Sequence, residues 1–232
     1  MSRNLVLAAT LLLTGGALFA TPIAGVCGTG FAANCGAQIN ATSGLPDGNF
    51  TLISNANGTG TTAYVTNNSQ FPIPPWLADT ATGEWIGPAL NGNENTSDTV
   101  GNFFYQESFS LAGLDPTSAT ISGFWAVDNN GCIFLNGTNT GDCINGTAAA
   151  NYSVLTAFSI VNGQGGATFN AGANTIVFET VNTASMSTNP TGVFVEMSGT
   201  ANLLGAVPEP ASFAFVGLGL AAIGLVRRRL RF

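Results

Sequence analysis

Between Asn4 and Val226 the chain has no cationic side chain. It contains no Lys or His, and its five arginines lie only at the two ends, at Arg3, Arg227, Arg228, Arg229 and Arg231. Twelve carboxylates lie in the intervening stretch, so no salt bridge between side chains can form there. Counterion release from a phosphate backbone requires Lys or Arg. Nucleic acid is therefore excluded as a partner.

The missing residue types also exclude most catalytic chemistry. Without His there is no imidazole base, so Ser-His and Cys-His nucleophile pairs cannot form. The four cysteines are not spaced as CxxC pairs, and no Gly-rich loop is followed by Lys. What remains is carboxylate chemistry, meaning a glycosidase-like acid pair or an oxygen-ligated cation.

The N-terminus, MSRNLVLAATLLLTGGALFA, has the three parts of a secretory signal peptide. Arg3 supplies the positive region, residues 5–13 an apolar core, and residues 17–20 a small-residue cleavage zone. A transmembrane helix is disfavoured because the apolar core is short and Gly15-Gly16 interrupts it. We expect cleavage after Ala20, with Ala24 as the alternative.

The C-terminus also has three parts in order. Pro208, Glu209 and Pro210 precede sixteen uncharged, mostly apolar residues, 211–226, and then the arginine cluster. As a helix, this segment would reach about 24 Å, enough to span a thinned bilayer if the arginines snorkel. The positive-inside bias then holds the arginines in the cytoplasm.

This tail closely resembles the PEP-CTERM sorting signal of exported proteins in Gram-negative bacteria that make exopolysaccharide. The resemblance implies that Pro208-Glu209-Pro210 is the motif recognised by an exosortase. It also implies that Arg227, Arg228, Arg229 and Arg231 stop transfer while residues 211–226 anchor the chain in the inner membrane.

Between the two ends, apolar residues alternate with polar ones. In GNFFYQESFSL, Phe103, Tyr105 and Phe109 share one face while Ser108 and Ser110 take the other. TSATISGFWAV and TGVFVEMSG alternate in the same way, and six Asn-Gly dipeptides favour tight hairpins. The pattern predicts an all-β fold, an antiparallel jelly-roll-like β-sandwich flanked by the N-terminal signal helix and a C-terminal transmembrane helix.

Residues 75–200 resemble the galactose-binding-like jelly roll of many carbohydrate-binding modules. The resemblance rests on the order of strand patterns, and it implies a fold more than a function. The organisation we expect is a signal peptide (1–20), a Gly/Asn/Thr-rich segment joining the sandwich (21–70), the sandwich (71–202), a linker (203–210), a transmembrane helix (211–226) and a basic cytoplasmic tail (227–232).

Four cysteines in an exported chain indicate two disulfides. Three pairings exist for Cys27, Cys35, Cys132 and Cys143. Local closure, Cys27 with Cys35 and Cys132 with Cys143, is the simplest and is our hypothesis. The second pair would brace a hairpin that turns at Asn136-Gly137.

Two carboxylates are candidates for chemistry. Glu107 lies on the apparent core face, where burial would raise its pKa, but no partner is identifiable, so we favour a bulge or strand-end position that turns it to solvent. Asp128 in DNNG could ligate a structural Ca²⁺. It lacks the acid spacing of an EF-hand loop, so an Asx turn is preferred.

Tryptophans are the candidate sugar contacts. Trp125 falls on a core face and should pack inside, whereas Trp76 follows Pro74-Pro75 outside a clear strand. We therefore assign Trp76 as the candidate glycan contact, although packing is the default for a large aromatic side chain.

Together these features predict a non-enzymatic exported protein. It would use the secretion translocon, signal peptidase and an exosortase, and would reach the cell surface or an exopolysaccharide matrix as a structural or carbohydrate-binding component. We expect no cofactor beyond the Ca²⁺ just considered. The alternatives are an extracellular glycan-active enzyme using a carboxylate pair, and a passive cargo.

Intact mass spectrometry of the cell-associated and secreted forms checks these assignments. We expect loss of the first 20 residues, loss of the tail near Pro208 in the secreted form, and a mass deficit for two disulfides. A cytosolic, soluble, full-length chain would contradict the export prediction.

Overall fold

The computed structural model describes residues 20–39, 44–58, 60–66, 75–89, 98–146, 150–183 and 189–204, which belong to one compact unit, Ala20–Leu204. Its strands are β1 (Ala20–Pro22), β2 (Pro46–Ser54), β3 (Thr62–Val65), β4 (Ile86–Gly87), β5 (Gly101–Ser110), β6 (Thr120–Asp128), β7 (Gly131–Leu135), β8 (Thr138–Ile144), β9 (Thr156–Val161), β10 (Ala173–Asn182) and β11 (Gly192–Asn202). One short helix, α1 (Ala150–Ser153), and two 3-10 turns, η1 (Pro116–Ser118) and η2 (Gln164–Gly166), complete the described elements.

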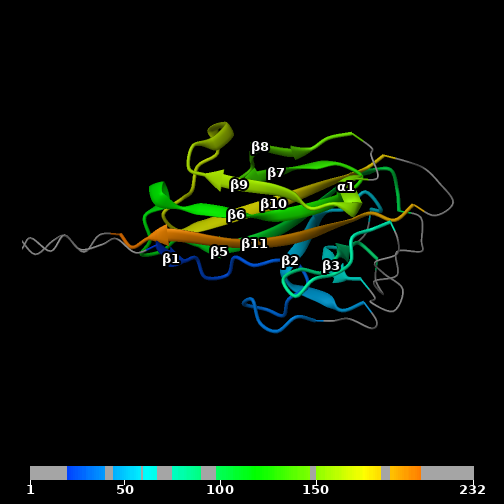
Figure 1. The fold of residues 1–232 in the computed structure, drawn as a ribbon, viewed down its shortest axis with the longest axis horizontal. Helices are drawn as coiled ribbons and strands as arrows, with labels where there is room; N and C mark the ends of the chain where they lie inside the picture. The colour runs from blue at the N-terminus through cyan, green and yellow to red at the C-terminus, as the bar shows by residue number, and fades with distance from the viewer. Residues whose placement is uncertain are drawn as a thin grey trace, which may run out of the picture. The chain divides into compact units, whose positions relative to one another are not determined.

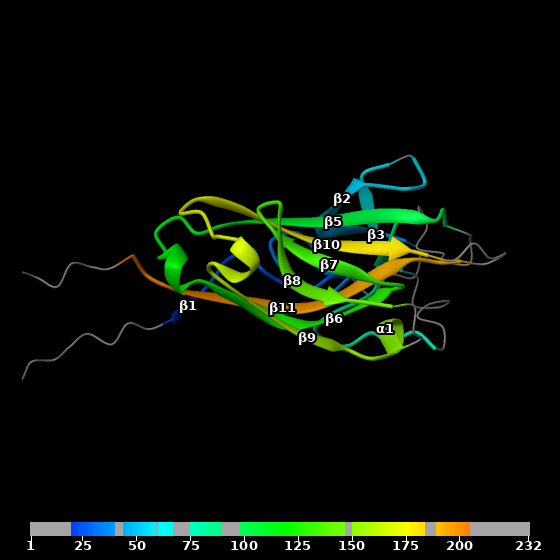
Figure 2. The same ribbon diagram turned by 90° about the horizontal axis from the view of Figure 1, so that it is seen from above.

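The strands form a two-layer antiparallel sandwich. The hydrogen-bonded order is β8-β7-β10-β5-β2-β3-β4-β11-β6-β9, with β1 beside β11, and the short strands β3 and β4 link the two layers. Figure 1 shows β9, β6 and β11 side by side, and Figure 2 shows them opposite β5, β10 and β7. The predicted all-β antiparallel sandwich is confirmed. The predicted signal and transmembrane helices lie outside the described residues.

An aromatic cluster joins the two layers. The ring of Phe178 on β10 lies 6.1 Å from Phe50 on β2, and 5.7 Å from both Trp125 on β6 and Phe158 on β9. All four side chains are buried, and each occupies an inward position of its strand. Trp125 therefore packs in the core, as its alternation predicts.

Both disulfides close locally, as the spacing predicts. Cys27 pairs with Cys35, and Cys132 pairs with Cys143 across the hairpin of β7 and β8. The turn of that hairpin is Asn136-Gly137, with φ of 50° and 81°. Both values lie in the left-handed region that a tight two-residue hairpin requires and that Asn and Gly tolerate.

The two ends of the described unit lie together. β1 pairs with the end of β11, with Ala20 opposite Asn202 and Pro22 opposite Thr200. The first and last described residues of the unit therefore lie at neighbouring positions of the same sheet. Within the residues that the structure covers, no helix has the length and hydropathy to cross a membrane.

Replacing Phe178 with Ala should lower the free energy of unfolding by about 3–5 kcal/mol, because it leaves a cavity between the layers. Phe124→Ala is the matched control. Its ring is 48% exposed, so the change should cost no more than about 0.5 kcal/mol. Denaturant unfolding followed by tryptophan fluorescence measures both, and equal losses would contradict the assignment of the core.

Candidate functional site

The outer face of β11, β6 and β9 is partly open to solvent. Ser122 and Phe124 of β6 point outward. On the neighbouring strand β11, Ser198 lies opposite Ser122 and Glu196 lies opposite Phe124. The remaining outward positions carry hydroxyl or aliphatic side chains: Thr120, Thr200, Ala157, Ser159 and Val161. We call these nine residues the open face. It combines one exposed aromatic ring with hydroxyl groups and one carboxylate.

A hollow of about 270 Å³ lies on this face. It is lined by Thr82, Ser122, Gly123, Phe124, Glu196, Met197 and Ser198. The hydroxyl groups of Thr80 and Thr82 donate to Oε1 of Glu196, the second at 2.8 Å. These two threonines thus fix the carboxylate at the wall of the hollow.

A second apolar cluster covers the other end of the same face. Trp76, Trp85, Ala126 and Phe194 form it, and the rings of Trp76 and Trp85 lie 4.3 Å apart. Trp76 is only 8% exposed. A sugar platform needs a free ring face, so the assignment of Trp76 as an exposed glycan contact is wrong. The ring packs instead on Trp85, nine residues further along the chain, a contact that strand patterns do not reveal.

The polar edge of Trp76 meets Asp128 at the end of β6. Burial raises the pKa of Asp128 to about 7, although hydrogen bonds from Trp76 and from the Asn129 amide oppose the increase. The described partners of this carboxyl group are thus side chains, and the preferred Asx turn is wrong. Ca²⁺ binding by Asp128 remains a prediction.

A second buried carboxylate, Asp98, lies near Asp128 and contributes to its raised pKa. The amide of Asn57 donates to Oδ1 of Asp98 at 2.7 Å, and the backbone N–H of Thr191 donates to Oδ2 at 3.1 Å. Neutral groups therefore satisfy the charge on Asp98 at this end of the sandwich.

Glu107 lies inside the protein. β5 pairs with β10 in unbroken register from Gly101 to Ser110, so no bulge turns the side chain outward, and it is 1% exposed. The prediction that Glu107 faces solvent is wrong. Burial raises its pKa to about 9, with a smaller increase from the charge of Asp47, while the backbone N–H of Cys27 lowers it.

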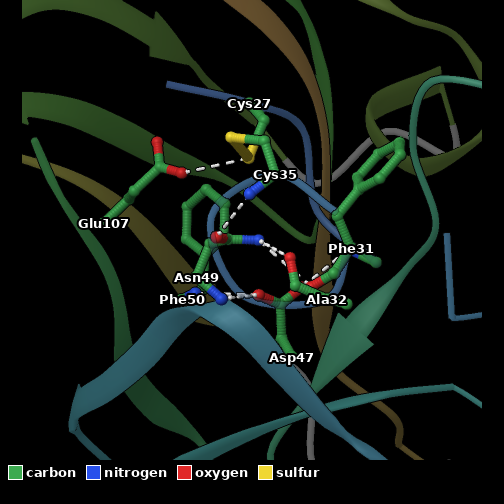
Figure 3. The surroundings of a disulfide bond; sticks show 9 residues. Cys27, Phe31, Ala32, Cys35, Asp47, Asn49, Phe50 and Glu107 are labelled. Atoms are coloured by element: carbon green, nitrogen blue, oxygen red, sulfur yellow. Dashed lines mark hydrogen bonds between the residues drawn. A yellow bond between two sulfur atoms is a disulfide. The ribbon is translucent and has the colours of Figure 1, made fainter. Parts of the chain in front are cut away.

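The carboxyl group of Glu107 faces the Cys27–Cys35 disulfide (Figure 3), and Oε1 lies 3.4 Å from Sγ of Cys27. No hydrogen-bond partner of Oε2 occurs among the described atoms. Sequence alternation placed Glu107 on the core face, but only the structure shows what it meets there.

Asp47 and Asn49 of β2 hold the disulfide loop. Asp47 accepts hydrogen bonds from the backbone N–H groups of Gly30 and Phe50, at 2.6 and 2.8 Å. Asn49 accepts from the backbone N–H of Cys35 and donates to the carbonyl groups of Phe31 and Ala32, as Figure 3 shows. The loop is thus attached to β2 independently of its disulfide.

The fold and open face define an antiparallel β-sandwich with a shallow polar–aromatic surface. Comparison with protein families adds the sorting signal: residues 206–229 match the model described as the PEP-CTERM protein-sorting motif. The chain thus carries this signal, as its tail predicts, and the signal implies export and processing by an exosortase. Its motif, Pro208 to Pro210, and Arg227, Arg228, Arg229 and Arg231 lie outside the described residues.

No curated protein matches the chain. Solved structures that match include a family 35 carbohydrate-binding module from Clostridium thermocellum, at 12% identity and a TM-score of 0.30, covering 55% of this chain and 81% of the other. A CBM35 from Paenibacillus barcinonensis matches at 14% identity and a TM-score of 0.29, covering 62% and 95%. TM-scores this low do not establish a shared fold.

The open face itself was partly visible in the sequence. In TSATISGFWAV, Phe124 is an aromatic residue at a position where the alternation expects a polar one. In TGVFVEMSG, Glu196 occupies a polar position. An aromatic residue on the solvent side of a strand was the signal. That the two side chains are neighbours depends on the pairing of β6 with β11.

The raised pKa values predict that the domain loses stability as pH rises. The folded state holds protons on Asp128 and Glu107 that the unfolded chain releases near pH ~4. The free energy of unfolding should therefore fall from about pH 4 through the folded pKa values of about 7 and about 9. Each group contributes at most about 1.4 kcal/mol per pH unit.

Two variants separate the contributions. Asp128→Asn should reduce the slope only below pH ~7, whereas Glu107→Gln should remove the fall between pH ~7 and pH ~9. Urea unfolding at several pH values measures this. A wild-type stability that rises across the same range would refute the assignment.

Proposed function

We propose that this exported β-sandwich binds uncharged polysaccharide on its open face. The observation that carries the proposal is the exposed ring of Phe124 beside the hollow that Glu196 and hydroxyl side chains line. An exposed aromatic ring offers a flat apolar surface for the C–H face of a sugar.

The polar groups of the hollow suit sugar hydroxyls. A carboxylate has about four acceptor sites, and the hydroxyl groups of Thr80 and Thr82 use part of this capacity on Glu196. Ser122 and Ser198 lie beside it and can both donate and accept. A glycan hydroxyl would therefore find acceptors and donors within one site.

Charge favours an uncharged polymer. Of the twelve carboxylates in the chain all but Glu209 lie between residues 20 and 204, and no Lys, Arg or His lies there. An anionic polysaccharide would meet repulsion that no nearby cation offsets.

Sorting supports the place of action. We infer that residues 211–226 hold the chain in the inner membrane after the translocon and signal peptidase have acted. Exosortase processing then delivers the domain to the cell surface or exopolysaccharide matrix. The matched sorting motif supports this route.

The proposal favours binding over cleavage. Glycosidases use two carboxyl groups that flank the bond, whereas Glu196 is the carboxylate among the residues that line the hollow. Glu107 and Asp47 are buried beside the disulfide loop and do not line it.

Affinity electrophoresis of the exported form in gels containing neutral polysaccharides tests the proposal. Phe124→Ala should weaken retention by about tenfold, on the order of 1.4 kcal/mol, and Glu196→Gln should weaken it as well. Ile53→Ala is the control, since Ile53 is 51% exposed but lies on β2.

If the Phe124→Ala variant is retained as strongly as the wild type, the open face is not the binding site. New reducing ends after incubation with the polysaccharide would favour the enzyme. If the wild type neither binds nor cleaves the polysaccharide, the hypothesis of a passive cargo protein would remain.

A further inference from the structure

The Cys27–Cys35 disulfide has a carboxyl group directed at one of its sulfur atoms. Oε1 of Glu107 lies 3.4 Å from Sγ of Cys27, and Oε2 has no hydrogen-bond partner among the described atoms. A disulfide sulfur carries no hydrogen, so a hydrogen bond across this contact requires the protonated carboxyl group, the form that burial favours at Glu107. Figure 3 shows the carboxyl group of Glu107 directed at the disulfide.

The two sulfur atoms differ in their surroundings. Cys27 is flanked by buried residues, Val26 and Gly28, whereas Cys35 is flanked by exposed residues, Asn34 and Gly36. Both cysteines are half-buried. An incoming thiol would therefore reach the Cys35 sulfur from the loop side, while Cys27 becomes the leaving group beside Glu107.

Hydrogen bonds that do not depend on the disulfide attach its loop to β2. Asp47 and Asn49 bind the backbone of Gly30, Phe31 and Cys35 through hydrogen bonds that do not involve sulfur. Two free thiols would therefore remain close to each other and to Glu107. Such a site can open and close again without unfolding of the sandwich.

We propose that Cys27–Cys35 is a redox-active disulfide and that Glu107 acts as the proton donor when an external thiol opens it. The reaction partner is a dithiol, either a small molecule or the active-site pair of a thiol–disulfide exchange protein. This inference is independent of the glycan-binding proposal.

The exchange balances in two steps. A thiolate of the dithiol attacks Sγ of Cys35, the S–S bond breaks, and its electron pair passes to Sγ of Cys27, which takes the proton of Glu107. The second thiolate of the dithiol then attacks the mixed disulfide and releases Cys35 as a thiolate, which water protonates. The dithiol is oxidised by two electrons, and Glu107 recovers its proton from water.

The titratable group that faces Glu107 from a neighbouring element is Asp47 of β2, whose charge favours the protonated carboxyl group. Among the described residues, no hydrogen bond joins a carboxyl group to a sulfur of the second disulfide; the neighbouring carboxyl group of Glu179, whose pKa burial also raises, accepts a hydrogen bond from the backbone N–H of Cys132. Sγ of Cys143 lies 3.9 Å from Oδ1 of Asn139, an amide oxygen that carries no proton. Cys132–Cys143 is therefore an internal control in the same molecule.

The test measures how fast dithiothreitol opens each disulfide in the folded, exported protein. Samples are quenched with acid and alkylated, and the two cysteine pairs are quantified by peptide mass spectrometry. Glu107→Gln should slow opening of Cys27–Cys35 by about tenfold or more and leave Cys132–Cys143 unchanged. Asp128→Asn, which alters a buried carboxyl group elsewhere, should change neither rate.

The sign of the rate change distinguishes loss of the proton donor from disturbance of the loop. Loss of the donor should slow the opening of the disulfide, whereas a disturbed loop would open faster. In the wild type, the rate for Cys27–Cys35 relative to Cys132–Cys143 should fall as pH rises through the pKa of Glu107, about 9. This profile decides the question even if Glu107→Gln does not fold. A pH-independent ratio, or a Gln variant that opens at the wild-type rate or faster, would overturn the proposal.

Discussion

The domain has no cation with which to pair its carboxylates. Because no Lys, Arg or His lies between residues 4 and 226, each charge must be met by an amide, hydroxyl, indole or backbone N–H donor. The described pairs are Asp98 with Asn57, Asp142 with Gln164, Glu179 with Asn102, Glu196 with Thr80 and Thr82, Asp128 with Trp76 and Asn129, and Asp47 with backbone N–H groups. The abundance of Asn and Thr thus has a structural use, since these residues replace Lys and Arg as carboxylate partners.

The absence of cations explains why burial shifts the pKa values of the carboxyl groups in one direction. Where a shift is resolved within the described ranges, at Asp47, Asp79, Glu107, Asp128 and Glu179, the pKa is raised and desolvation is the largest cause. A neighbouring cation would oppose desolvation, but the domain has none. Neutral donors offset only part of the cost, so Glu107, whose pKa is raised to about 9, remains protonated at neutral pH and can serve as a donor itself.

Local alternation predicted the strands and their inward residues, because a strand repeats every two residues whatever it pairs with. It placed Trp125 in the core and indicated an inward position for Glu107, but the prediction that this side chain faces solvent was wrong, because it rested on the lack of an identifiable partner. What lies opposite could not be predicted, since the loop that brings Cys27 to Glu107 is separated from it by 80 residues. The prediction for Trp76 was wrong because its burial depends on packing with Trp85 and Phe194, and strand alternation does not describe a residue that lies outside a strand. The local disulfides were predictable because their spacing restricts the closure.

The position of β11 has a mechanical consequence. The described unit ends at Leu204, two residues beyond this strand, and the sorting motif begins at residue 206. β11 is paired to β6 along nine residues and to β1 at its end. Under the proposed function, a pull on the tail that a polymer bound across the open face resists would load this ladder in shear. Several hydrogen bonds would then have to break together before β11 yields, so this strand would resist the pull better than one that peels away a bond at a time.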